Sequence, residues 1–101
     1  MRIISFKKLR EFWADKRYID SEQSLRSWYC EVKKDEWKSH SDIKKKYGTA
    51  SILKGGVTVF NIKGNKYRLV AGVDYDYQAV YIKFIGTHEE YNKINLEKYG
   101  H

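Results

Sequence analysis

The stretch "VTVFNIKGNKYRLVAGVDYDYQAVYIKFI", residues 57–85, decides the fold of this chain. It contains three segments rich in β-branched and aromatic residues, 57–62, 66–75 and 79–85, which is the composition of β-strands. The first two are joined by "KGN", a short Gly/Asn hairpin signal, and the last two by a turn around "DYDYQ". Three consecutive strands with such short connections are predicted to form an antiparallel meander.

Side chains alternate between the two faces of a strand, so one face of this sheet is expected to be apolar. The residues predicted to supply that face are Phe60, Ile62, Leu69, Val73, Val80, Ile82 and Phe84. The chain before the strands has the spacing of helices that would cover it. Leu25, Trp28, Tyr29 and Val32 lie at i, i+3, i+4 and i+7, with Asp20 and Gln23 as the expected cap. Segment 5–16 likewise places Phe6, Leu9, Phe12 and Trp13 near one helical face.

The last element is predicted to be a short helix that begins at Thr87. Its hydroxyl and the Glu90 carboxylate, three residues apart, have the spacing of a capping box. His88 is then the first helical residue, and Tyr91 and Ile94 share one face. The predicted fold class is α+β, with N-terminal helices packed on one face of a twisted antiparallel sheet and residues 1–101 forming one domain.

Composition restricts the partners of the chain. The net charge is +7, and residues 1–54 carry 14 Lys and Arg against 8 Asp and Glu. Such an excess favours nucleic acid, the ribosome or an acidic protein as partner, although it also suits a merely soluble surface. No apolar run approaches the length of a bilayer span, the N-terminal apolar stretch is too short for a signal peptide, and the single cysteine excludes an internal disulfide. These features predict a cytoplasmic protein without membrane association.

The strands carry cations that need an explanation. Lys66 and Arg68 alternate with Tyr67 and Leu69, which predicts that the two cations share one face, and Lys83 lies among apolar neighbours. They could simply line the wet side of a two-layer fold, or they could form a phosphate-binding surface. The helix start at His88 would add N–H donors for an anion. His88 itself could be an ordinary surface histidine or a proton-transfer group.

Three segments resemble the HigB-type toxins of bacterial toxin–antitoxin modules, which belong to the RelE-like superfamily of mRNA interferases. They are "VFNIKGNKYRLV" (59–70), "YIKFIGTHEEYNKI" (81–94) and "DIKKKYGTASIL" (42–53). The resemblance implies a RelE-like fold and a metal-independent endoribonuclease that cleaves mRNA, usually on the translating ribosome. It also implies neutralisation by a small HigA-type helix-turn-helix antitoxin. One position departs from the pattern, because Asn92 follows the tyrosine where an Asp is common.

The resemblance also implies roles for residues of this chain. Those expected to take part in catalysis are Arg68, His88, Tyr91 and Lys83, and those expected to contact RNA are Lys66, Lys54, Lys63 and Asn61. No cofactor is implied, and the three histidines, His40, His88 and His101, lack metal-ligand spacing. Two other functions stay open at this point. The chain could be a non-catalytic RNA- or ribosome-binding domain, or an interaction domain whose charge meets an acidic antitoxin.

Overall fold

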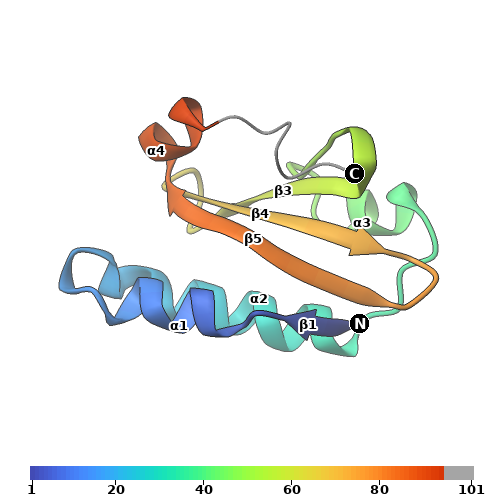
Figure 1. Ribbon diagram of the computed structural model, residues 1–101, viewed down its shortest axis with the longest axis horizontal. Coiled ribbons are helices and arrows are strands. Elements are labelled where there is room, and N and C mark those ends of the chain that lie inside the picture. Colours follow the sequence, from blue (N-terminus) through green and yellow to red (C-terminus); the bar gives the residue numbers. More distant parts are fainter. Residues whose placement is uncertain (95–101) are drawn as a thin grey trace.

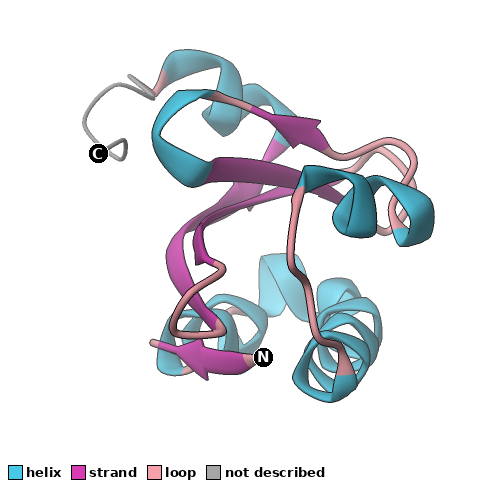
Figure 2. Cartoon of the chain, turned by 90° about the vertical axis from the view of Figure 1, so that its right-hand side faces the viewer, coloured by secondary structure: helices cyan, strands magenta, loops and turns pink. Residues whose placement is uncertain are grey.

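The computed structural model describes residues 1–94 and contains one five-stranded sheet in the order β1-β5-β4-β3-β2 (Figure 1). The strands are β1 (Arg2–Ile4), β2 (Ser51–Ile52), β3 (Val57–Ile62), β4 (Tyr67–Asp74) and β5 (Ala79–Thr87). The predicted meander β3-β4-β5 is antiparallel, while β1 pairs with β5 in parallel, so the sheet is mixed. The strongly twisted shape of this sheet is clearest in the side view (Figure 2).

Helices lie on both sides of the sheet. The helical elements are α1 (Lys7–Ala14), η1 (Lys16–Ser21), α2 (Glu22–Lys34), α3 (His40–Lys46), η2 (Lys54–Gly56) and α4 (His88–Lys93). Helices α1 and α2 cover one side, and α4 lies on the other (Figure 1). The α+β class and the short C-terminal helix are therefore as predicted. None of the helices in residues 1–94 has the length and apolarity to cross a membrane.

The main core lies between the sheet and the N-terminal helices. Leu9, Leu25 and Val32 of the helices are completely buried against it, as the helical spacing predicted. The ring of Phe60 is at its centre, with ring centroids of Trp28 and Tyr47 each 5.3 Å away. Six of the seven strand residues predicted for this face are part of the main core: Phe60, Ile62, Leu69, Val73, Val80 and Ile82.

Phe84 is the exception. In the β4–β5 ladder Ala71 pairs with Ile82 and Val70 with Phe84, so Lys83 is an extra, unpaired residue. This β-bulge shifts the alternation by one residue and turns Phe84 to the opposite face. There it packs with Val70 and the α4 side chains in a second, smaller apolar cluster. The prediction for Phe84 was wrong because the alternation was counted across an irregular position.

The helix starts gave one confirmed and one incorrect prediction. At α4, the Thr87 hydroxyl accepts from the Glu90 N–H at 3.1 Å and the Glu90 carboxylate accepts from the Thr87 N–H at 2.8 Å, which is the expected capping box. At α2, Asp20 does not cap the helix, because η1 runs directly into α2 through Ser21. The Asp20 carboxylate instead accepts hydrogen bonds from Lys66 and Tyr67.

Candidate functional site

Arg68 lies on the central strand of the sheet. Its position in β4 pairs with Asn61 of β3 and with Gly86 of β5. Its neighbours Tyr67 and Leu69 face the main core, so Arg68 faces the opposite side together with Val70. Because Val70 packs in the cluster that includes Tyr91 and Ile94, Arg68 shares the sheet face on which α4 lies.

The guanidinium of Arg68 is held by neutral oxygens only. Its Nη1 donates to the main-chain oxygen of Asn65 at 3.0 Å and to that of Tyr67 at 3.4 Å, and its Nη2 donates to Oδ1 of Asn65 at 2.7 Å. Among residues 1–94, no carboxylate forms an ion pair with Arg68, whose side chain is half-buried. The positive charge is therefore oriented but not compensated, which suits the binding of an anion.

Lys66 does not share the face of Arg68, contrary to the strand prediction. It precedes β4, in the hairpin turn, and its ammonium forms an ion pair with Asp20 of η1. The buried Tyr67 donates its hydroxyl to the same carboxylate. The hydrogen bond from Lys66, followed by that from Tyr67, lowers the pKa of Asp20. Lys66 thus connects the hairpin to η1 on the helix-covered side.

The N-terminus of α4 is less open to an anion than the sequence suggested. The His88 N–H donates to the Lys66 carbonyl at 3.1 Å, and the Glu90 N–H donates to the Thr87 hydroxyl. The first turn also carries two acidic side chains, Glu89 and Glu90. These bonds and charges disfavour a phosphate at the helix tip itself. The exposed side chain of His88 remains, two residues beyond Gly86, which pairs with Arg68.

Tyr91 and Lys83 both lie on the sheet face of Arg68, but at different positions along it. The ring of Tyr91 packs against the apolar cluster of Val57, Val59 and Val70, and it is partly exposed. The Lys83 ammonium is 5.6 Å from the ring centroid of Tyr81. The Lys83 stem passes over Gly72, where a Cβ would come within 3.3 Å of its Cε. Lys83 therefore lies further along the face, because Gly72 is four residues beyond Arg68 on β4.

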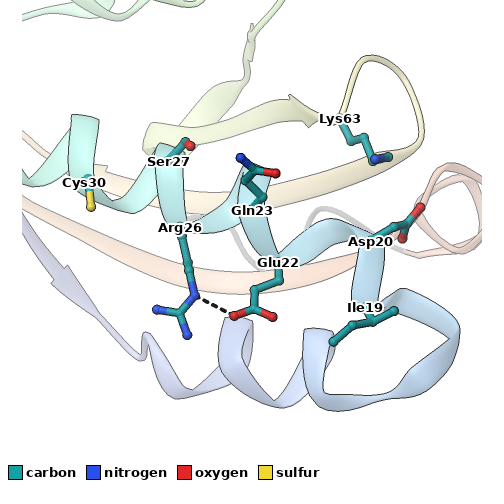
Figure 3. A pocket seen from close by; sticks show the side chains of 8 residues that line it. All are labelled: Ile19, Asp20, Glu22, Gln23, Arg26, Ser27, Cys30 and Lys63. Atoms are coloured by element: carbon teal, nitrogen blue, oxygen red, sulfur yellow. Dashed lines mark hydrogen bonds and ion pairs between the residues drawn. The ribbon is translucent and has the colours of Figure 1, made fainter.

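The three remaining predicted RNA contacts are not all close to Arg68. Asn61 is the cross-strand neighbour of Arg68, and together with Lys63 it lines a polar groove of about 470 Å³ between α2 and the β3–β4 hairpin. Lys63 also borders an adjoining groove of about 610 Å³, where it reaches from the hairpin on the side of Asp20 (Figure 3). Lys54, by contrast, lies in η2 before the start of β3 and so at the far end of the strand from Asn61.

The sequence interpretation missed Asn65, the main hydrogen-bond partner of Arg68. The sequence did contain a signal for this contact. An Asn in a hairpin turn, three residues before an Arg on the following strand, is within hydrogen-bonding reach of the guanidinium. The structure thus places Arg68 opposite Gly86, two residues before His88, and on the sheet face of Tyr91, with Asn65 as its hydrogen-bond partner and Lys54 at the far end of β3. In the described part of the chain no three His, Cys, Asp or Glu side chains form a group that could hold a metal ion, and His101 lies outside it.

An α+β domain with N-terminal helices on one face of a sheet and a short C-terminal helix is consistent with the RelE-like class of toxins. A family model, HigB_toxin, described as the RelE-like toxic component of a toxin-antitoxin system, matches residues 21–94 of the chain. The chain therefore belongs to the HigB_toxin family, and this membership implies an antitoxin as its partner. A search of curated protein sequences finds no matching relative.

Proposed function

We propose that this toxin is an mRNA interferase, a metal-independent endoribonuclease that cleaves mRNA on the translating ribosome in the cytoplasm. A HigA-type antitoxin would neutralise it, and residues 1–101 would act as one toxin domain. The observation that carries the proposal is the uncompensated guanidinium of Arg68 on the central strand. Membership of the RelE-like toxin family and the net charge of +7 support it, since phosphate contacts dominate affinity for RNA.

The chemistry needs no metal, because the nucleophile belongs to the substrate. The ribose 2′-oxygen attacks the adjacent phosphorus while the bond from phosphorus to the 5′-oxygen breaks. A base removes the proton of the 2′-hydroxyl and an acid protonates the leaving 5′-oxygen, giving a 2′,3′-cyclic phosphate and a 5′-hydroxyl. Arg68 would stabilise the added negative charge of the pentavalent phosphorus, an effect of roughly 3 kcal/mol per donor.

The other predicted residues would assist this step. The exposed His88 lies two residues beyond Gly86, the cross-strand partner of Arg68. It would act as general acid or base, an effect on the order of 10²–10⁴ in rate. Tyr91 would offer its partly exposed ring for stacking on a base or would share in proton transfer. Lys83, on the same face, would hold the RNA backbone at a neighbouring phosphate, and Lys63 would do so from the hairpin.

Cleavage of a translated message tests the proposal. Arg68→Ala is expected to lower the cleavage rate by at least about 10²-fold, and His88→Ala by a smaller factor. Arg10→Ala is the matched control, because Arg10 is an exposed arginine of α1, on the other side of the sheet. Unchanged cleavage by Arg68→Ala would remove the proposed role of the arginine and leave only family membership.

A second function deserves the same assay. The predicted proton-transfer groups are His88 and Tyr91, and because the Tyr91 ring packs in an apolar cluster, His88 is the more exposed of the two. This sparse set would also suit a non-catalytic RNA- or ribosome-binding domain. Such a domain would arrest translation without producing new RNA ends that carry a 2′,3′-cyclic phosphate, whereas the interferase would produce them.

A further inference from the structure

We propose that Asn65 is the positioning residue for Arg68, an inference that rests on the proposed role of that arginine in RNA cleavage. Both oxygens of Asn65 accept from the same guanidinium. The main-chain oxygen takes Nη1 at 3.0 Å and the side-chain Oδ1 takes Nη2 at 2.7 Å. Two contacts from one residue fix both the direction and the plane of the guanidinium.

This arrangement prepares Arg68 for a phosphate before RNA arrives. A free arginine side chain has many rotamers, and their loss on binding weakens any contact that the arginine makes. Asn65 removes part of that freedom in the folded protein. The Nε donor of Arg68 has no partner within residues 1–94, so it stays available for an oxygen of the substrate.

The choice of an amide matters as much as its position. An aspartate in the same place could accept the same hydrogen bonds, but its negative charge would compensate the guanidinium. An asparagine orients Arg68 and leaves its full charge for the phosphodiester. The Arg68–Asn65 pair therefore keeps its positive charge, whereas the charge of Lys66 is compensated by the Asp20 carboxylate to which its ammonium is bonded.

The turn that carries Asn65 is itself well defined. Lys63 and Gly64 both have a positive φ, 53° and 66°, which is the conformation of a tight hairpin turn. The Lys66 N–H closes the turn on the Lys63 carbonyl at 3.3 Å. Gly64 adopts this φ without strain, and the hydrogen bond between Lys66 and Lys63 holds the turn that carries Asn65.

Single-turnover cleavage of a message on programmed ribosomes tests the inference with two Asn65 variants, a control at Asp76 and a double variant compared with its Arg68→Lys background. Asn65→Ala is expected to lower the rate by roughly 10–100-fold, the usual loss when an orienting partner is removed. Asn65→Asp is expected to be slower than the wild type and to show a weaker dependence on salt, because it compensates one cation. Asp76→Ala, an exposed residue of the other hairpin turn, should cleave at the wild-type rate. Melting temperatures of all variants identify any loss that comes from unfolding.

The double variant, compared with Arg68→Lys alone, separates positioning from a merely structural effect. In an Arg68→Lys background the cation is a point charge that needs no planar orientation, so adding Asn65→Ala should cost less than about threefold. A full additive loss in this background would overturn the positioning role. A wild-type cleavage rate for Asn65→Ala would also overturn the positioning role of Asn65. A wild-type rate for Asn65→Asp would show that the partner of Arg68 does not have to be neutral. Wild-type cleavage by Arg68→Ala, in contrast, would refute the proposed function itself.

Discussion

Lys66 and Arg68 are two residues apart, yet their side chains leave the hairpin on opposite sides of the sheet. Lys66 pairs with the Asp20 carboxylate beside the N-terminal helices. Arg68 is held by Asn65 on the face where α4 lies. The two cations therefore have different tasks, one in holding the fold together and one in presenting charge to a ligand.

Replacing each cation by methionine should separate these tasks. Lys66→Met is expected to lower the melting temperature, because it leaves Asp20 without its ion-pair partner, while cleavage of a translated message stays within about tenfold of the wild type. Arg68→Met should leave the melting temperature nearly unchanged and lower cleavage by at least about 10²-fold. Thermal unfolding and a cleavage assay on the same preparations check both. The reverse ranking in cleavage would assign the catalytic role to Lys66.

The stability of the protein is expected to fall in acid through Asp20. The hydrogen bonds from Lys66 and Tyr67 lower the pKa of Asp20 below its ordinary value of 3.8. A carboxyl with a lowered pKa stabilises the folded state above the ordinary value and loses that contribution as the pH falls through the lowered pKa. Urea unfolding followed from neutral pH down through about 3.8, the upper end of the pH window in which this contribution is lost, should show a shallower acid slope for Asp20→Asn than for the wild type. Equal slopes would contradict this assignment.

Two threonine-to-valine substitutions should change stability in opposite directions. Thr58 is completely buried and its hydroxyl has no hydrogen-bond partner within residues 1–94, so Thr58→Val should stabilise the protein by about 1 kcal/mol. The Thr87 hydroxyl caps α4, so Thr87→Val should destabilise it by about 1 kcal/mol. Urea denaturation of both variants measures the difference. A loss of stability in Thr58→Val would mean that its hydroxyl is in fact satisfied.

Gly86 is expected to be sensitive to the smallest side chain. A Cβ at this position would come within 2.6 Å of the Phe84 ring and within 3.0 Å of the Glu90 carboxylate that completes the capping box. Gly86→Ala should therefore cost about 1–3 kcal/mol. Gly48→Ala is the matched control, since nothing lies within 4 Å of its added Cβ and its φ is ordinary. Similar unfolding midpoints for the two variants would show that the Phe84 ring moves aside freely.

Much of the fold could be predicted from the sequence, because local rules determined it. The alternation of residues 57–62, the apolar spacing from Leu25 to Val32 and the Thr87–Glu90 pair each specify one element without reference to the rest of the chain. The parallel pairing of β1 with β5 is different. It joins Arg2 to Ala79, and no local pattern records a contact over that separation.

The site was less predictable, because it depends on where regular structure begins and shifts. Lys66 was assigned to the Arg68 face by alternation, but β4 begins only at Tyr67, so the rule did not apply to it. Phe84 was assigned to the main core, but the bulge at Lys83 reversed its direction. The partnership of Arg68 with Asn65 involves a turn residue, whose side chain direction follows from the turn geometry and not from strand alternation.

Arg68 is on a strand that pairs with a neighbour on each side. Its position therefore depends on the whole sheet, and substitutions far from Arg68 can abolish toxicity by unfolding that sheet. Because Arg68 pairs with both β3 and β5, we expect its backbone to be better protected from exchange with solvent than that of α4, which contributes no buried residue. Among cells that survive expression of the toxin, we therefore expect many substitutions that unfold the sheet and few that only remove the charge of Arg68. A folded variant that lacks this charge should still bind the antitoxin, whereas an unfolded variant should not, so binding to the antitoxin distinguishes the two.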